Sequence, residues 1–161
     1  MEHLMIKIND YLPSAKLQYF KDGEMITASI DDIFTNKKVV LFAVPGAFTP
    51  TCSNAHLPGY VVNYDAFMEK GIDTIICLSV NDAFVMNAWG KSQNAENILM
   101  AADGGADFTK ALGLESETGL FGGIRSRRYA MVIENKMVTA LNIEEPKSFK
   151  VSDAETILTS L

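Results

Sequence analysis

The sequence predicts an α/β domain in which helices flank a mixed central sheet. In the middle of the chain, apolar strand-like runs alternate with segments of helical spacing, and this alternation is typical of layered α/β domains. Near each end, two strand-like runs are separated by a tight-turn signal, which predicts a hairpin. The chain contains no internal repeat, low-complexity tract or Pro/Gly/Ser linker. We therefore expect one domain over residues 1–161.

The composition is that of a globular protein. Hydrophobic residues make up 48% of the 161 residues and charged residues 21%, so a sizeable core is expected and disorder is not. The net charge of -6 argues against nucleic acid or an anionic membrane surface as the main partner. No apolar run approaches the roughly 20 residues of a membrane helix, and no secretory signal pattern opens the sequence. A cytoplasmic protein is therefore expected.

The first elements should be a hairpin, a helical turn and a strand. Two strand-like runs, 16–20 and 24–30, are separated by Lys21-Asp22-Gly23, in which Asp-Gly favours a tight turn. A short helical turn is expected over residues 31–35. The wholly apolar run Val39–Val44 then predicts a buried strand.

A helix should follow that strand after a short loop. Thr49 suits the N-cap position, and Pro50 suits the first helical position, where its missing N–H costs nothing. Pro58 should interrupt or kink the helix, because it removes a backbone donor. Helical spacing then resumes and ends near Gly71.

The second half should add strands on both sides of short helices. The expected elements are a buried strand at 74–80, a helix from Asn81 or Asp82 to Trp89, a strand at 98–102, a helix at 108–112, a surface loop at 115–123, and strands at 128–134 and 137–143 joined at Asn135-Lys136. Ser152-Asp153-Ala154-Glu155 fits a capping box and predicts a final helix to Leu161.

Cys52 is the leading candidate for chemistry. It should lie in the first turn of the helix that begins near Thr49, among backbone N–H groups without partners inside the helix. The positive end of the helix dipole favours the thiolate form of a cysteine there, and the thiolate is the nucleophile. From position alone the alternative stays open that Cys52 is a buried, inert side chain.

The residues around Cys52 carry a family resemblance. PGAFTPTC, residues 45–52, resembles the Pro-x-x-x-Thr-x-x-Cys motif of peroxiredoxins, and VPGAFTPTCSNAHLPGY is similar to their atypical type II or type V subfamily. Further matches are SVNDAFV at 79–85, Trp89-Gly90, RYAMV at 128–132 and ALN at 140–142. The resemblance implies a thioredoxin-like fold with an extra N-terminal hairpin. It also implies a thiol-specific peroxidase that reduces hydrogen peroxide and organic hydroperoxides without a metal, heme or flavin.

The resemblance also implies residue roles. Cys52 would be the peroxidatic cysteine, which attacks one peroxide oxygen and becomes a sulfenic acid. Thr49, at the first position of a Thr-x-x-Cys pattern, would form hydrogen bonds with the thiolate and the peroxide. Pro45 would shield the thiolate from bulk water and shape the pocket.

A basic cluster, Arg125-Ser126-Arg127-Arg128, stands out in this acidic chain. A charge run is usually a solvated face. The resemblance implies, however, that an arginine preceding an aromatic residue on a strand places a permanent cation beside the cysteine, and Arg128 followed by Tyr129 matches it. Arg125 and Arg127 are expected to be surface residues.

Cys77 lies in an apolar strand and is expected to be buried and inert. The open alternative is a resolving cysteine that forms a disulfide with Cys52. Subfamily members that resolve internally use a cysteine near the C-terminus, and residues 144–161, EEPKSFKVSDAETILTSL, contain none. A one-cysteine cycle is therefore expected, completed by an external thiol: glutathione with glutaredoxin, or thioredoxin.

Other functions have weaker support. His56 follows Cys52 by one helical turn, so a Cys–His hydrolase dyad is conceivable, although the resemblance makes His56 structural. A zinc site would have only Cys52, Cys77, His3 and His56, without paired spacing. A peroxide sensor or chaperone-like redox binding protein without efficient turnover is the alternative to an enzyme.

Apolar residues around Phe48, Phe84 and Phe121 raise the question of assembly. The resemblance implies a homodimer that pairs near the active site, and these residues would form its face. From the sequence alone, a local core cluster is an equal alternative.

Overall fold

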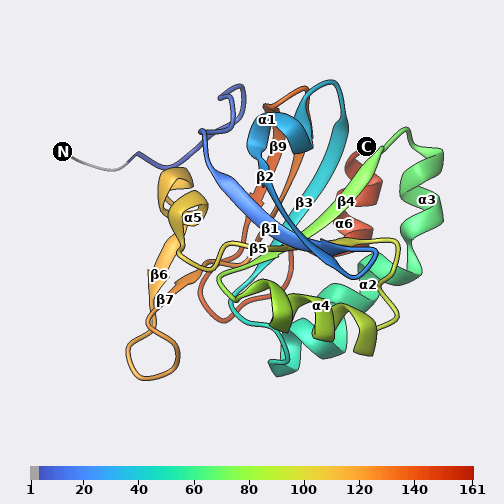
Figure 1. The fold of residues 1–161 in the computed structure, drawn as a ribbon. Coiled ribbons are helices and arrows are strands. Elements are labelled where there is room, and N and C mark those ends of the chain that lie inside the picture. Colours follow the sequence, from blue (N-terminus) through green and yellow to red (C-terminus); the bar gives the residue numbers. More distant parts are fainter. Residues whose placement is uncertain (1–3) are drawn as a thin grey trace.

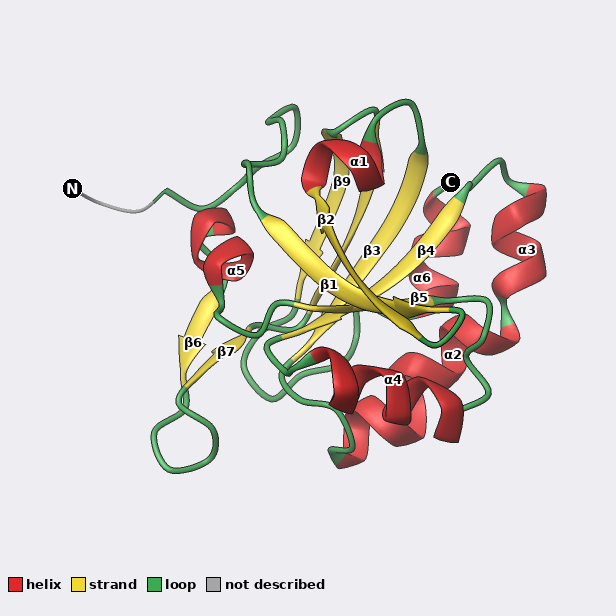
Figure 2. Cartoon of the chain, in the orientation of Figure 1, coloured by secondary structure: helices red, strands yellow, loops and turns green. Residues whose placement is uncertain are grey.

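The computed structural model describes residues 4–161 and has a seven-stranded mixed sheet at its centre. The strand order is β2-β1-β5-β4-β3-β8-β9 (Figures 1 and 2). The strands are β1 (Lys16–Lys21), β2 (Glu24–Ser29), β3 (Lys38–Val44), β4 (Thr74–Ser79), β5 (Leu99–Ala102), β8 (Tyr129–Glu134) and β9 (Met137–Ile143). β3, β4 and β5 are parallel, and the remaining pairs are antiparallel. The predicted mixed α/β fold is confirmed.

Both predicted hairpins are present. β1 and β2 are joined at Asp22 and Gly23, and β8 and β9 are joined at Asn135 and Lys136. All four turn residues have positive φ, between 47° and 80°, as a type I′ turn requires. The N-terminal hairpin extends the sheet beyond β5, because β1 pairs with β5 at Gln18.

Helices cover both faces of this sheet. They are α1 (Ile30–Phe34), the π-helical turn η1 (Cys52–His56), α2 (Leu57–Val62), α3 (Tyr64–Glu69), α4 (Ala83–Ser92), α5 (Asp107–Leu112) and α6 (Ala154–Ser160). α2, α3, α4 and α6 lie on one face, and α1 and α5 lie on the other (Figure 1). No helix within residues 4–161 is long and apolar enough to cross a bilayer.

β3 is buried on both sides, which explains its unbroken apolar sequence. Successive residues of a strand point to opposite faces. Phe42 and Val44 therefore pack in the cluster that contains Cys52 and α2, whereas Leu41 and Ala43 pack against α1 and α5 on the other face. This double burial fixes the end of β3, from which the chain turns towards Cys52.

Pro58 does not interrupt the helix at the predicted position. The N–H of Leu57 donates to the carbonyl of Cys52, an i to i+5 bond that makes the preceding turn π-helical. The helical path continues through Pro58 and breaks at Asn63, whose Nδ2 donates to the Gly59 carbonyl at 2.8 Å. The π turn and the proline therefore sit together inside one helical segment.

Two further expectations are corrected. The segment predicted as a surface loop, 115–123, contains β6 (Glu115–Glu117), which pairs with β7 (Ile124–Ser126) in a small separate hairpin. The N-cap of α6 is Asp153, whose side chain accepts from the Thr156 N–H at 3.1 Å. Ser152 is not the cap, because it is fully buried and its hydroxyl donates to Glu144.

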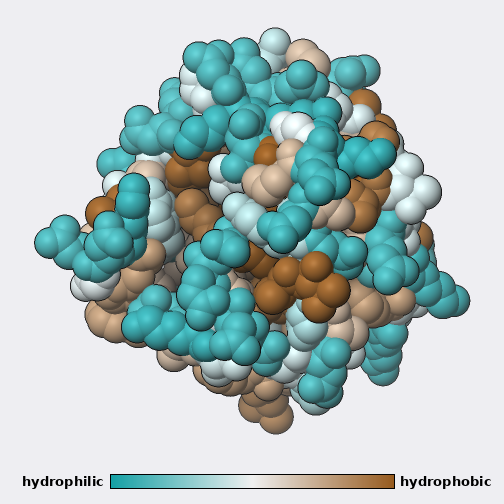
Figure 3. Space-filling view, turned by 90° about the vertical axis from the view of Figure 1, so that its right-hand side faces the viewer, coloured by the Kyte–Doolittle hydropathy of each residue, from teal (hydrophilic) through white to brown (hydrophobic). Residues whose placement is uncertain are grey.

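On the side of the molecule seen in Figure 3, the surface is mainly hydrophilic. Figure 3 views the side that carries α3 and α6 and shows apolar side chains exposed in small areas between polar ones.

Candidate active site

Cys52 lies beside the carboxyl end of β3. After Val44 the chain makes the loop Pro45–Thr49 and becomes helical at Pro50. The Thr49 carbonyl accepts from the Ser53 N–H at 2.9 Å, so the helix begins where the N-cap prediction placed it. Cys52 follows in the first turn and is 0% exposed. Ligand sites commonly lie at the carboxyl ends of strands in open α/β sheets.

Arg128 reaches Cys52 from the neighbouring strand. It immediately precedes β8, which pairs antiparallel with β3 so that Tyr129 lies opposite Ala43. Its Nη2 donates to Cys52 Sγ at 3.1 Å. Guanidinium donors stabilise an anionic acceptor through a charge-assisted hydrogen bond. The pairing of β8 with β3 thus brings the cation and the thiol together across 76 residues of sequence.

His56 holds the other branch of the same guanidinium. Arg128 Nη1 lies 2.8 Å from His56 Nδ1, and His56 Nε2 lies 3.1 Å from the Ser152 carbonyl oxygen. Since arginine can only donate and a carbonyl can only accept, Nδ1 is the acceptor and Nε2 carries the proton. Burial, and then the charge of Arg128, lower the pKa of His56 to about 3, so the ring is neutral.

This arrangement argues against the hydrolase alternative. The Nδ1 lone pair of His56 is occupied by Arg128, and Nε2 is directed at Ser152. A general base for Cys52 needs a free lone pair facing the sulfur. His56 instead acts as an acceptor that orients Arg128.

Acidification is expected to destabilise the protein through His56. The unfolded ring titrates near 6.5 and the folded ring near 3, so between these values the unfolded state binds a proton that the native state does not. The contribution is complete above about pH 6.5 and is lost progressively as the pH falls towards 3. Between about pH 7 and about pH 5 we expect a loss of about 2 kcal/mol in the free energy of unfolding.

Urea denaturation at the two pH values measures this loss, and His56→Gln is the comparison. The variant lacks the titrating ring, so its free energy of unfolding should fall by about 2 kcal/mol less than that of the parent. Equal decreases in both proteins would contradict the neutral buried state of His56.

Thr49 and Pro45 lie at the end of β3, but Thr49 does not make the expected contact with sulfur. Its hydroxyl donates to the Gly46 carbonyl at 2.7 Å, and within residues 4–161 no hydrogen bond joins it to Cys52. The hydroxyl proton is taken up inside the Pro45–Thr49 loop. Its lone pairs therefore remain available as acceptors.

A cavity of about 460 Å³ opens beside these residues. Pro45, Thr51, Arg128 and Phe149 are among the residues that line it. The Phe149 ring lies over the Arg128 guanidinium, with 5.8 Å between its centroid and Cζ, and 4.9 Å from the His56 ring centroid. No pattern in the sequence pointed to Phe149, which lies in the polar segment between β9 and α6.

Arg125 and Arg127 are partly buried rather than free surface residues. Arg125 Nη1 donates to the Val80 carbonyl at 2.7 Å and its Nε donates to the Gly122 carbonyl at 3.1 Å. Arg127 Nη2 donates to the Glu144 carbonyl at 3.4 Å. Only Arg128 of the three reaches Cys52, as predicted, and the other two hold loops around it.

Cys77 is a buried thiol on β4. It pairs with Phe42 of β3 in the middle of the sheet and is not in a disulfide. Burial, and then the proximity of Cys52, raise the pKa of the Cys77 thiol well above its usual range. It is therefore held in its neutral, weakly nucleophilic form.

Phe48, Phe84 and Phe121 do not form a local core cluster. Their exposed fractions are 56%, 65% and 65%. The elements that carry them are the β3–η1 loop, the start of α4 and the β6–β7 loop, which all lie along the lower side of Figure 1. This is the side on which the chain turns towards Cys52.

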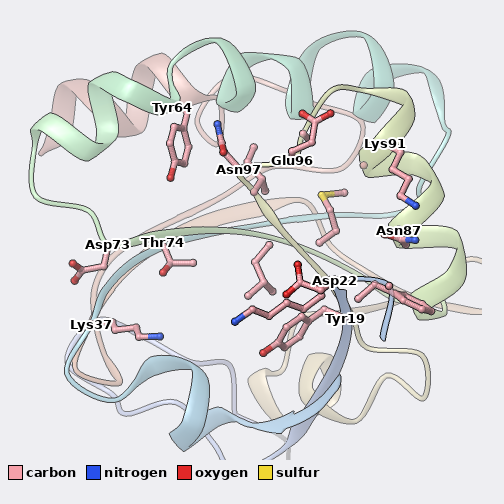
Figure 4. Close-up of a pocket in the computed structure, with 18 residues that line it drawn as sticks. Tyr19, Asp22, Lys37, Tyr64, Asp73, Thr74, Asn87, Lys91, Glu96 and Asn97 are labelled. Atoms are coloured by element: carbon pink, nitrogen blue, oxygen red, sulfur yellow. The ribbon is translucent and has the colours of Figure 1, made fainter. Parts of the chain in front are cut away.

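A second cavity, of about 720 Å³, lies at the opposite ends of β3 and β4. Figure 4 shows Lys37 and Asp73 on one side of it and Lys91 on the other. Basic and acidic side chains line it in equal number, namely Lys21, Lys37 and Lys91 with Asp22, Asp73 and Glu96. It shares no lining residue with the cavity at Arg128.

Within residues 4–161 no group of three or more His, Cys, Asp or Glu side chains could hold a metal ion. His3, named above as a possible ligand, lies outside the described residues.

Comparison with known proteins assigns the family. The Redoxin family model matches residues 7–158. A reduced Prx3 from Vibrio vulnificus, solved in complex with hydrogen peroxide, is 60% identical, with 97% of this chain and 99% of that chain covered and a TM-score of 0.95. Peroxiredoxin-2D of Arabidopsis thaliana is 46% identical over 97% of this chain and 98% of its own. A 1-Cys peroxiredoxin of Plasmodium falciparum is 30% identical, with 94% and 96% covered and a TM-score of 0.88. The chain therefore belongs to the Redoxin family and, within it, to the peroxiredoxins, enzymes that reduce hydroperoxides with a cysteine thiol.

Proposed function

We propose that Cys52 is the nucleophile of this peroxidase. The contact that carries the proposal is the 3.1 Å hydrogen bond from Arg128 Nη2 to Cys52 Sγ at a fully buried position. The thiolate sulfur attacks one peroxide oxygen, the S–O bond forms, and the O–O bond breaks. The second oxygen takes a proton and leaves as water or an alcohol, and Cys52 becomes a sulfenic acid.

The surrounding groups stabilise the oxygens in this step. Arg128 donates to the sulfur and to the oxygen under attack with a fixed fork of N–H groups. Within residues 4–161 no acceptor is bonded to the Cys52 N–H, which is free to donate to the peroxide. The Thr49 hydroxyl donates a hydrogen bond to the Gly46 carbonyl, and a lone pair of its oxygen accepts a hydrogen bond from the peroxide O–H. Pro45, at the edge of the cavity, limits the access of bulk water.

The cycle is completed by an external thiol. One thiol attacks the sulfenic acid, a mixed disulfide forms and water leaves; a second thiol then releases the Cys52 thiol and an external disulfide. Glutathione with glutaredoxin, or thioredoxin, supplies these thiols. The buried, neutral state of Cys77 supports a cycle without it. Because Cys52 is itself buried, η1 must open for the reductant to reach the sulfur.

A peroxide-consumption assay that compares glutaredoxin with glutathione, thioredoxin, and dithiothreitol tests the proposal. Continuous turnover with one of the physiological systems is the expected result. Oxidation of Cys52 that stops after one equivalent of peroxide with every reductant would favour the alternative, a peroxide sensor or chaperone-like protein.

Cys77→Ser is expected to retain most of the turnover with glutathione and glutaredoxin. The hydroxyl is buried within an apolar sheet, so a loss of about 1–3 kcal/mol in stability is expected without loss of mechanism. Cys77→Ala, which buries no hydroxyl, is the matched control and should behave alike in turnover. A large loss in both variants, with a Cys52–Cys77 disulfide in the oxidised parent, would restore the two-cysteine cycle.

We also propose a homodimer that pairs through Phe48, Phe84 and Phe121. Three exposed aromatic rings near the active site support this face, because large exposed apolar areas commonly mark interaction sites. Phe121→Glu should shift the molar mass from dimer to monomer in light scattering after size exclusion. Val62→Glu, which changes an 83% exposed residue of α2, is the control and should leave the mass unchanged. A monomeric parent protein would contradict the proposal.

A further inference from the structure

Glu144 is a buried carboxylate behind the active site. It follows β9, and its N–H donates to the Arg128 carbonyl at 3.0 Å, which places it beside the strand position of the arginine. Its exposed fraction is 4%. A charged group is seldom buried unless other groups compensate for the loss of water.

Four donors from one short segment provide that compensation. Glu144 Oε2 accepts from the N–H groups of Val151 and Ser152 at 2.8 Å each and from the Ser152 hydroxyl at 2.7 Å. The Lys150 N–H donates to both carboxylate oxygens at 2.9 Å. Three successive N–H groups around one anion form a rigid nest. Burial raises the pKa of Glu144, but these hydrogen bonds outweigh it and lower the pKa below its usual value, so the carboxylate is ionised.

The nest fixes the Ser152 carbonyl, which is the anchor of two active-site rings. This oxygen accepts from Tyr60 Oη at 2.7 Å and faces His56 Nε2 at 3.1 Å. His56 Nδ1 in turn accepts from Arg128 Nη1 at 2.8 Å, and Arg128 Nη2 donates to Cys52 Sγ at 3.1 Å. Hydrogen bonds on either side of the Ser152 residue therefore link the Glu144 carboxylate, through His56 and Arg128, to the sulfur.

We infer that Glu144 is a positioning residue for peroxide reduction: through Ser152 and His56 it holds Arg128 in the orientation that donates to Cys52. The inference rests on the proposed role of Cys52. Glu144 lines the cavity beside Arg128, but within residues 4–161 its carboxylate makes no hydrogen bond to Cys52, His56 or Arg128. Its effect on the rate is exerted through the fixed tautomer and ring position of His56.

A purely structural role makes a different prediction. If Glu144 only stabilised the segment between β9 and α6, its loss would lower the free energy of unfolding and leave the folded active site unchanged. A positioning role requires that the folded variant also has a misplaced His56 and a slower reaction with peroxide.

The test compares Glu144→Ala, Glu144→Asp and Glu144→Gln with the parent. Glutamine keeps an acceptor oxygen at the same distance, whereas aspartate shortens the side chain and alanine removes the acceptor. The second-order rate constant for hydrogen peroxide should fall roughly 10- to 100-fold in the alanine and aspartate variants. Glutamine should restore it to within about 3-fold of the parent. Glu134→Ala, which removes an exposed carboxylate at the far end of β8 from Arg128, is the matched control and should react like the parent.

The ¹⁵N chemical shifts of His56 provide a readout that does not depend on catalysis. The chain has two histidines, so the assignment is simple. The parent should show one neutral tautomer with the proton on Nε2, and the aspartate and alanine variants should show a mixture. If Glu144→Ala does not fold, Glu144→Asp carries the test. This readout also separates the inference from the proposed nucleophile, whose failure would appear as peroxide turnover by Cys52→Ser.

A double-mutant cycle with His56→Gln completes the design. If Glu144 acts through His56, the rate loss of Glu144→Asp should largely disappear in the His56→Gln background. The inference is overturned if folded Glu144→Asp and Glu144→Ala react at the parental rate with one His56 tautomer. It is also overturned if Glu144→Asp and His56→Gln reduce the rate constant independently, so that their effects add in the double variant.

Discussion

Cys52→Ser is expected to abolish peroxide reduction and to leave the fold intact. Serine has nearly the same shape, and its hydroxyl can accept the Arg128 hydrogen bond that Sγ accepts at 3.1 Å. Its oxygen cannot replace sulfur as the thiolate nucleophile or form a sulfenic acid. We expect steady-state peroxide consumption to fall by more than about 10³-fold, since loss of a nucleophile removes the chemical step itself.

Two measurements make this result interpretable. Urea denaturation should give a cooperative transition for Cys52→Ser, so that a loss of activity cannot be attributed to unfolding. The Cys77 variants, with the same change at the other cysteine, should keep most of their turnover. Peroxide consumption by Cys52→Ser above the uncatalysed rate would refute the proposed nucleophile.

Arg128→Lys is expected to reduce the second-order rate constant for peroxide by about 10²-fold. Lysine keeps the charge, but its compact ammonium lacks the planar fork that donates to Cys52 Sγ and His56 Nδ1 at once. Arg128→Met removes the charge as well and should cost about 10³-fold. Rapid mixing with peroxide can follow the reaction through Trp89, the only tryptophan, whose Nε1 donates to Ser53 Oγ next to Cys52.

Arg125→Lys is the matched control for this substitution. Arg125 donates to the Val80 and Gly122 carbonyls rather than to sulfur, so the same chemical change should alter the rate by less than about 3-fold. If Arg128→Lys reacted at the parental rate, a nearby positive charge would be sufficient and the fork geometry would not matter.

Local patterns in the sequence predicted the central sheet well. Val39–Val44 is wholly apolar because both faces of β3 are covered, and such a run identifies a buried strand without any knowledge of its neighbours. The turns at Asp22-Gly23 and Asn135-Lys136 were predictable because Asp, Gly and Asn tolerate the positive φ that such turns require. The three-residue strands β6 and β7 were missed, since a run of that length shows no reliable alternation.

The candidate site was predicted by resemblance more than by local physics. Cys52 could be identified from its place at a helix start, but the choice of Arg128 among three arginines depended on the family pattern. The support behind Arg128 could not be predicted from the sequence, because Glu144, Ser152 and His56 meet only after β9 and α6 have packed. Ser152 was even assigned to a helix cap, since its motif resembles one.

The Thr49 prediction shows the same limit on a smaller scale. A threonine before a helix and three residues before a cysteine can donate to the sulfur or cap the helix. The loop conformation, with Phe48 at φ 65°, instead directs its hydroxyl to the Gly46 carbonyl. Hydroxyl direction depends on the acceptor that the folded loop presents, and the spacing in the sequence does not specify it.

Trapping of the oxidised cysteine tests the central claim most directly. The reduced protein is treated with one equivalent of hydrogen peroxide in the presence of dimedone, which labels sulfenic acid, and the labelled residue is identified by peptide mass spectrometry. We predict a single label on Cys52, with Cys77 still a free thiol. A label on Cys77, or a Cys52–Cys77 disulfide in place of the label, would contradict a one-cysteine peroxidase centred on Cys52.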